Sequence, residues 1–192
     1  MSGKGFHVHG PHEHELEHAA QHEPKGFAGK LAVITAILAT VGAFFSYTGG
    51  VTQVNAALYK NDAAIKKTEA SNQWAFFQAK SSKQNLSELA LDLSNNEEQK
   101  AKYRDKIARY EKEKNDIKVV AEKLEAESRH FDEQSAEQMH LHHRWAQATT
   151  ALQISIALAA ITLLTKRRWM EWATIAAGGV GLVLGGLAAA HL

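Results

Sequence analysis

The chain alternates between long apolar runs without charge and one long segment that is dense in charge. Three runs contain no Asp, Glu, Lys or Arg: Leu31–Tyr47, Ala148–Thr165 and Thr174–Leu192. An α-helix needs about 20 apolar residues to cross the roughly 30 Å hydrocarbon core of a bilayer. With their flanking residues, the three runs predict transmembrane helices at 28–48, 148–165 and 173–192.

Two alternatives to membrane-spanning helices are disfavoured. The first run lies near the N-terminus, as a cleaved signal peptide would, but a long acidic and basic stretch precedes it. The two later runs would suit a buried pair of core helices only if other segments covered them. The rest of the chain offers too little apolar surface to do so.

The charged segment 51–147 between the first two runs predicts an antiparallel helical hairpin. It contains no Pro or Gly, and it carries 16 Lys+Arg and 16 Asp+Glu. Ser94-Asn95-Asn96 divides it into arms of similar length, and Ser94 with Glu97 or Asn95 with Glu98 has capping-box spacing. Gly49–Gly50 predicts a kink after the first span, whereas no helix-breaking residue occurs at 144–149.

The second arm shows a coiled-coil pattern, and the first arm shows a rougher stripe. Alternate steps of four and three residues along the second arm reach mostly apolar side chains, with charged residues between them. These positions are Tyr103, Ile107, Tyr110, Lys114, Ile117, Ala121, Leu124, Ser128, Phe131, Ser135, Gln138, His142 and Trp145. The apolar stripe of the first arm consists of Leu58, Ile65, Trp74, Phe77, Leu86, Leu89 and Leu93. The predicted fold class is therefore all-α, with three transmembrane helices and a coiled-coil hairpin.

Basic residues beside the spans predict the orientation of the chain in the membrane. Lys25 and Lys30 precede the first apolar run, Leu31–Tyr47, and Lys166–Arg168 lies in the short loop 166–172 between the second and third spans. Basic residues in short loops stay in the cytoplasm, so we expect the N-terminus there. The hairpin and the C-terminus are then extracytoplasmic.

Composition excludes several functions. A net charge of +1 gives no sign of a nucleic-acid partner. The absence of cysteine excludes disulfides, thiolate metal sites and thiol catalysis.

The segment Asn72-Gln73-Trp74-Ala75-Phe76-Phe77-Gln78-Ala79-Lys80-Ser81 carries a family resemblance. It resembles the signature of the bacterial membrane proteins filed as domain of unknown function 4337, although Phe76 and Phe77 stand where tyrosines are common in that family. The resemblance covers nearly the whole chain and implies the same order of spans around a charged helical segment. It implies a bacterial inner (cytoplasmic) membrane location and no established activity.

The tail 1–27 is rich in histidine and glutamate. His14, His18 and His22 have the four-residue spacing that places side chains on one face of a helix, where they would bind Zn²⁺, Ni²⁺ or Cu²⁺. The alternative is a solvated, disordered tail without a physiological metal.

Two sets of residues are candidates for protein contacts. Trp74, Phe76, Phe77 and Gln78 form the aromatic cluster of the hairpin, which packs on the facing arm or binds a partner. Gly181 and Gly185 form a small-xxx-small pattern, which serves self-association or packing within the chain. With no nucleophile or phosphate-loop motif, we do not expect an enzyme. We expect a membrane-anchored scaffold that contacts lipid, its own copies and an envelope protein; the alternative is a metal-binding accessory protein.

Overall fold

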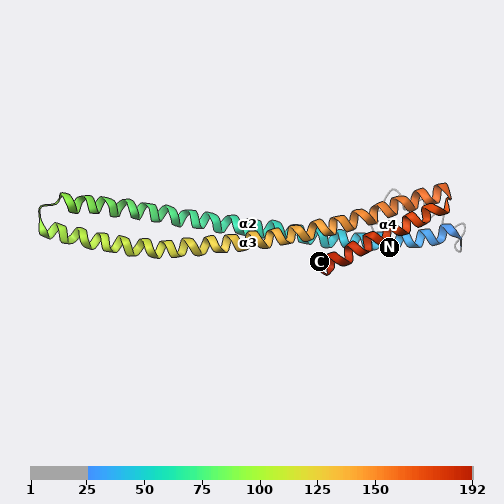
Figure 1. Cartoon of the computed structure of the whole chain (residues 1–192), viewed down its shortest axis with the longest axis horizontal. Coiled ribbons are helices and arrows are strands. Elements are labelled where there is room, and N and C mark those ends of the chain that lie inside the picture. The colour runs from blue at the N-terminus through green and yellow to red at the C-terminus, as the bar shows by residue number, and fades with distance from the viewer. Residues whose placement is uncertain (1–25, 192) are drawn as a thin grey trace, which may run out of the picture. The chain divides into compact units, whose positions relative to one another are not determined.

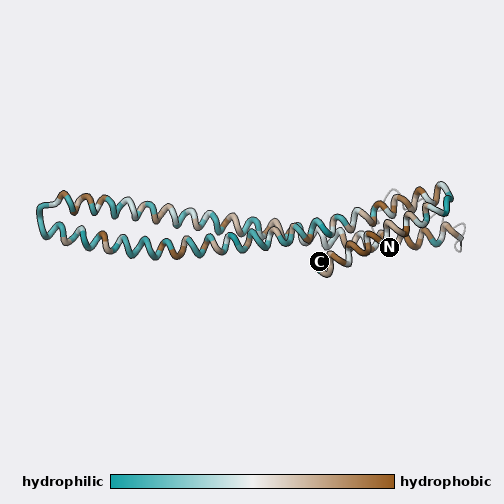
Figure 2. The backbone as a smooth tube through the Cα atoms, viewed as in Figure 1, coloured by the Kyte–Doolittle hydropathy of each residue, from teal (hydrophilic) through white to brown (hydrophobic). Residues whose placement is uncertain are grey.

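The computed structural model describes residues 26–191 and consists of three α-helices (Figure 1). They are α2 (Phe27–Leu93), α3 (Glu97–Thr165) and α4 (Arg168–Ala189). The all-α prediction is confirmed. Each helix is long and apolar enough to cross a membrane, as judged by length and composition. Hydrophobic residues gather in the first part of α2, the last part of α3 and in α4, as the predicted runs require (Figure 2).

Two compact units make up the chain, and α2 and α3 take part in both. The hairpin unit is Asn55–Glu137, and it pairs the later part of α2 with the earlier part of α3. Among the described residues, the three-helix unit contains 26–54 and 138–191, so that α4 joins the other parts of α2 and α3.

In the hairpin unit, α2 and α3 run antiparallel and approach each other closely. The Ser135 hydroxyl donates a hydrogen bond to the backbone carbonyl of Ala56 at 2.8 Å. One heptad further along, the Ser128 hydroxyl donates to the carbonyl of Ala63 at 2.9 Å. A side chain as short as serine reaches the opposite backbone only when small residues line the contact. Alanine supplies them: Ala56 and Ala63 are almost completely buried.

The thirteen positions of the predicted α3 seam are all buried or partly buried, so that prediction is confirmed. The rougher stripe on α2 does not form one face. Trp74 and Phe77 are partly buried, whereas Leu58, Ile65, Leu86, Leu89 and Leu93 are exposed. The seam of α2 that faces α3 is instead built around its small residues.

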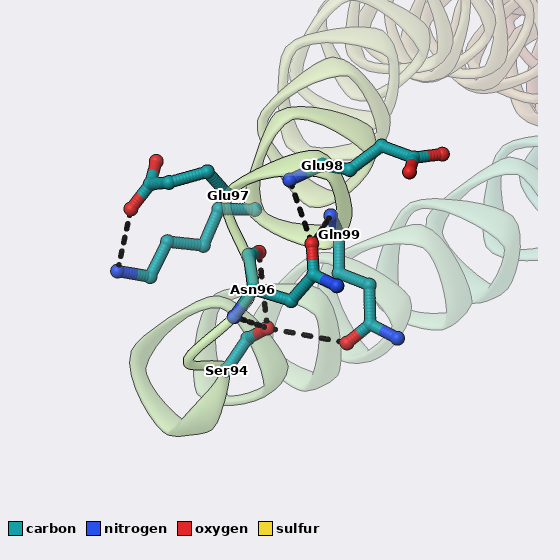
Figure 3. Close-up of polar contacts among 6 residues, drawn as sticks. Ser94, Asn96, Glu97, Glu98 and Gln99 are labelled. Carbon is teal, nitrogen blue, oxygen red and sulfur yellow. Dashed lines mark hydrogen bonds and ion pairs between the residues drawn. The ribbon is translucent and has the colours of Figure 1, made fainter.

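Asn96, in the turn between the arms, caps the N-terminus of α3 (Figure 3). Its side-chain oxygen accepts hydrogen bonds from the backbone N–H groups of Glu98 and Gln99, at 2.9 and 3.3 Å. This is the usual role of an N-cap asparagine. The predicted capping boxes placed the cap one or two residues too early, at Ser94 or Asn95. Ser94 instead accepts a hydrogen bond from the backbone N–H of Asn96.

The predicted kink at Gly49–Gly50 does not interrupt the helix, because α2 continues through both glycines. Gly49 serves a close approach, since a Cβ added there would lie 3.1 Å from the Cβ of Trp145. The carbonyl of Gly49 also accepts a hydrogen bond from Nδ1 of His142 at 2.8 Å, which fixes the proton on that nitrogen. α3 runs unbroken through 144–149, as predicted.

α4 packs against both neighbouring helices of the three-helix unit. The Ser155 hydroxyl of α3 donates to the carbonyl of Thr174 at 2.7 Å. Phe45, Trp145, Leu152 and Ala188 belong to one hydrophobic cluster. The predicted loop 166–172 is shorter in the structure: only Lys166 and Arg167 separate α3 from α4. Lys166 turns the chain with a left-handed φ of 52°.

Replacing Ser135 with leucine is expected to destabilise the hairpin. The larger side chain would force the helices apart, costing about 1–3 kcal/mol by overpacking and about 1 kcal/mol for the lost hydrogen bond. Thermal unfolding of the full-length protein in mild detergent, followed by circular dichroism, measures this. Ala136→Leu is the matched control, because Ala136 is exposed. Equal melting of both variants would contradict the close packing.

Candidate interaction surfaces

Trp74 and Phe77 of the predicted aromatic cluster contact the facing helix. The indole N–H of Trp74 donates to Glu125 at 2.9 Å. The Trp74 and Phe77 rings meet edge to face, with centroids 5.5 Å apart. The Lys114 ammonium lies 5.6 Å from the centroid of the Phe77 ring, a cation–π distance. These two aromatic side chains therefore hold the arms of the hairpin together.

Lys80 extends this set of contacts by one turn. Its ammonium pairs with the Glu113 carboxylate at 2.5 Å and lies 5.6 Å from the centroid of the Tyr110 ring. The hydrogen bond from Lys80 holds the pKa of Glu113 below its ordinary value of 4.5. In the same way, the hydrogen bond from Lys114 lowers the pKa of Glu111. We call Trp74, Phe77, Lys80, Glu113 and Glu125 the clasp.

Residues 27–191 match the sequence model of the protein family Domain of unknown function (DUF4337). The chain belongs to the DUF4337 family. No curated protein and no solved structure matches it. In this DUF4337 chain, the segment that resembles the family signature supplies three clasp residues, so it has a structural role in joining α2 to α3.

The other two residues of the aromatic cluster point away from the clasp. Phe76 is 59% exposed, and Gln78 is exposed as well. A large exposed aromatic side chain on a hairpin is a candidate for binding another protein. That Phe76 and Gln78 bind a partner stays a prediction.

Gly181 and Gly185 are buried inside the three-helix unit. A Cβ added at Gly181 would lie 2.6 Å from a methyl group of Leu152, and one added at Gly185 would collide with the Phe45 ring. Of the two predicted uses of these glycines, packing within the chain is therefore the one that the structure displays. Gly179 and Gly186 lie on another face of α4, with no neighbouring atom near an added Cβ.

The predicted metal ligands His14, His18 and His22 lie outside the described residues, so metal binding by the tail stays a prediction. Within residues 26–191, no three His, Asp or Glu side chains gather in a way that could hold a metal ion. An open groove of about 390 Å³ lies beside Gly49 and Gly50 in the three-helix unit. Gln53, His142 and Gln153 contribute polar groups to its lining.

The contacts of the clasp and of the seam were only partly predictable. Trp74 and Phe77 stood out by their size and spacing. Glu125, Lys80 and Glu113 did not, because charged residues flank the seam along both arms and their spacing does not reveal which ones pair. The pairing of Ala56 with Ser135 and of Ala63 with Ser128, which fixes the register, became visible only in the structure.

Valine in place of Gly181 is expected to destabilise the three-helix unit by about 1–3 kcal/mol, because Leu152 and its backbone leave no room for a branched side chain. Thermal unfolding of the purified protein in mild detergent measures the effect. Gly179→Val is the control, since its Cβ meets open space. If both variants melt like the original chain, the glycine is not needed for this packing.

Acid is expected to weaken the clasp. The pKa of Glu113 is lowered in the folded chain, so its contact with Lys80 stabilises fully above the unfolded value near 4.5 and is lost as the pH falls through the folded pKa. Glu113→Gln should therefore lower the melting temperature at neutral pH, and this difference should shrink as the pH falls below 4.5. The exposed Glu133 provides the control variant Glu133→Gln. A constant difference at all pH values would contradict this assignment.

Proposed function

We propose that this DUF4337 protein is a membrane-anchored scaffold of the bacterial inner membrane. Its three-helix unit would cross the bilayer, and its hairpin would stand outside the cytoplasm as a contact surface for other proteins. The observation that carries this proposal is the contrast between the exposed surfaces of the two units.

The exposed surface of the three-helix unit is apolar on all three helices. Large apolar side chains that are mostly or partly exposed include Val33, Ile37, Phe44, Ile154, Ile161, Leu164, Val180, Leu182 and Val183. Soluble monomers rarely expose so much contiguous apolar surface. Trp169 and Trp172 are exposed in the first turns of α4, which suits the aromatic belt at a membrane interface.

Threonine hydroxyl groups in the same segments donate hydrogen bonds within their own helices. The threonine side chains donate to backbone carbonyls three or four residues earlier, as lipid requires where water cannot supply a partner. These residues are Thr35, Thr40, Thr48, Thr52, Thr149, Thr150, Thr162, Thr165 and Thr174.

The hairpin unit has a charged surface that is suited to contact with water. Its arms are joined by salt bridges, such as the exposed pair of Lys60 with Asp132 at 2.8 Å and the partly buried pair of Lys66 with Glu127 at 3.4 Å. An exposed pair contributes little alone. At about 1.5 Å per residue, arms of this length extend roughly 60 Å, a reach that suits contact with other proteins.

A pair of reporter fusions tests this proposal. An enzyme that works only outside the cytoplasm should be active when fused at Asn95 in the hairpin turn, and inactive when fused at Arg167 between α3 and α4. The reverse pattern would contradict the orientation, and a protein that stays in the soluble fraction would contradict the anchor. Immunoblotting of both fusions controls for their expression.

A further inference from the structure

A second seam runs along the hairpin part of α2, on the side turned away from α3. Leu58, Ile65, Asn72, Ala79, Leu86 and Leu93 follow one another at seven-residue intervals. Asn61, Thr68, Ala75, Ser82 and Leu89 fill the positions three residues after each of them except the last. All eleven side chains are exposed. We call these eleven residues the outer seam.

The position of the outer seam follows from helical geometry. Ala56, Ala63 and Ala70 are buried, and the first two of them accept the serine hydrogen bonds from α3. Leu58 and Ile65 come two residues after Ala56 and Ala63, which is about 200° around the helix axis. The outer seam therefore lies roughly opposite the buried one. The five large side chains on it are 47–73% exposed.

Charge avoids the outer seam, although this part of α2 is rich in charge. Nine charged residues lie between Asn55 and Leu93, and none of them occupies the eleven positions. A helix face that water alone contacts has no reason to exclude charge at every third and fourth residue. An uncharged heptad pattern is the mark of a face that another helix covers.

We propose that the outer seam binds the outer seam of a second copy of this chain, so that two hairpins pair through parallel α2 helices. The parallel direction rests on the proposed function, because copies inserted in one membrane share an orientation. Identical residues then lie at the same level on the two helices.

The asparagines of the outer seam favour a second copy of this chain as the binding partner. Asn72 would meet its own equivalent, and an amide both donates and accepts a hydrogen bond, so an identical side chain satisfies it. A single asparagine at such a position favours two strands in fixed register. Asn61 has the same self-complementary chemistry.

The residues beside the seam also permit a parallel pair. In that arrangement, each flanking residue faces the residue five positions later on the other copy. The facing pairs are Ala57 with Asp62, Ala64 with Glu69, Ser71 with Phe76, Gln78 with Lys83, and Asn85 with Ala90. No two like charges face each other. The exposed Phe76 and Gln78 thereby gain a place at the edge of the same contact.

Single cysteines test the pairing directly, because the chain has no cysteine of its own. In native membranes, mild oxidation of full-length Ile65→Cys or Leu86→Cys should give a disulfide-linked dimer, since a disulfide needs Cα atoms about 4.4–6.8 Å apart. Lys67→Cys is the control, at an exposed position off the seam. We expect at least about tenfold less dimer from the control than from either seam variant.

A charge exchange tests whether the contact is specific. Ile65→Glu and Ile65→Lys should each reduce co-purification of two differently tagged copies about tenfold, and mixing the two variants should restore it. Lys67→Glu should leave co-purification unchanged. Circular dichroism of each variant establishes that the helices are retained.

Three results would overturn the pairing: equal crosslinking of Lys67→Cys, no dimer from either seam cysteine in a helical, membrane-bound protein, or crosslinking of the seam cysteines to a different protein. The second result would reject the pairing through the outer seam and leave the proposed membrane anchor unaffected. A reporter pattern opposite to expectation would reject the orientation while the seam dimer remained.

Discussion

The structure depends on how closely α2 and α3 approach each other in the hairpin. Ser128 and Ser135 reach the backbone carbonyls of Ala63 and Ala56 because the α2 residues at these two contacts are buried alanines. Each hydrogen bond contributes only about 1 kcal/mol. Its geometric role is larger, because the two bonds together fix which residues of α2 and α3 face each other. The clasp operates in that register, with Trp74 at Glu125 and Lys80 at Glu113.

The sequence predicted α3 better than α2 for a physical reason. α3 has one seam in the hairpin, so its buried positions stand out against charged neighbours from Tyr103 to Trp145. α2 has two seams on opposite sides, and the inner one also carries Lys66 and Lys80, so a single stripe drawn through the large residues of α2 mixes the two seams. Alanines face α3 together with Trp74 and Phe77, whereas Ile65 and four leucines face outward, so the size of a side chain does not indicate its burial. Only the position of α3 reveals which set is covered.

For the candidate contact residues too, the sequence identified the residues, and only the structure showed what they contact. The spacing of Gly181 and Gly185 is compatible with packing inside or between chains, and the choice requires knowing that Leu152 and Phe45 occupy the adjoining space. Phe76 and Phe77 are adjacent and alike in the sequence, yet helical geometry turns Phe77 toward Lys114 and leaves Phe76 exposed. Residue type identified both as candidates, whereas their separate roles depend on the rotation of α2 about its axis.

The repeating pairs of the hairpin restrict how its length can change. A deletion of seven residues from α2 between Ala63 and the turn would move its alanines by one heptad, so that Ala56 would face Ser128 and Ser135 would lose its partner Ala56. Removing one heptad from each arm would preserve the order of pairs and shorten the hairpin by about 10 Å. An insertion would likewise preserve the pairs only if it added seven residues to each arm. Hairpins built in this way should therefore differ in length among relatives in steps of fourteen residues, seven on each side of the Asn96 turn.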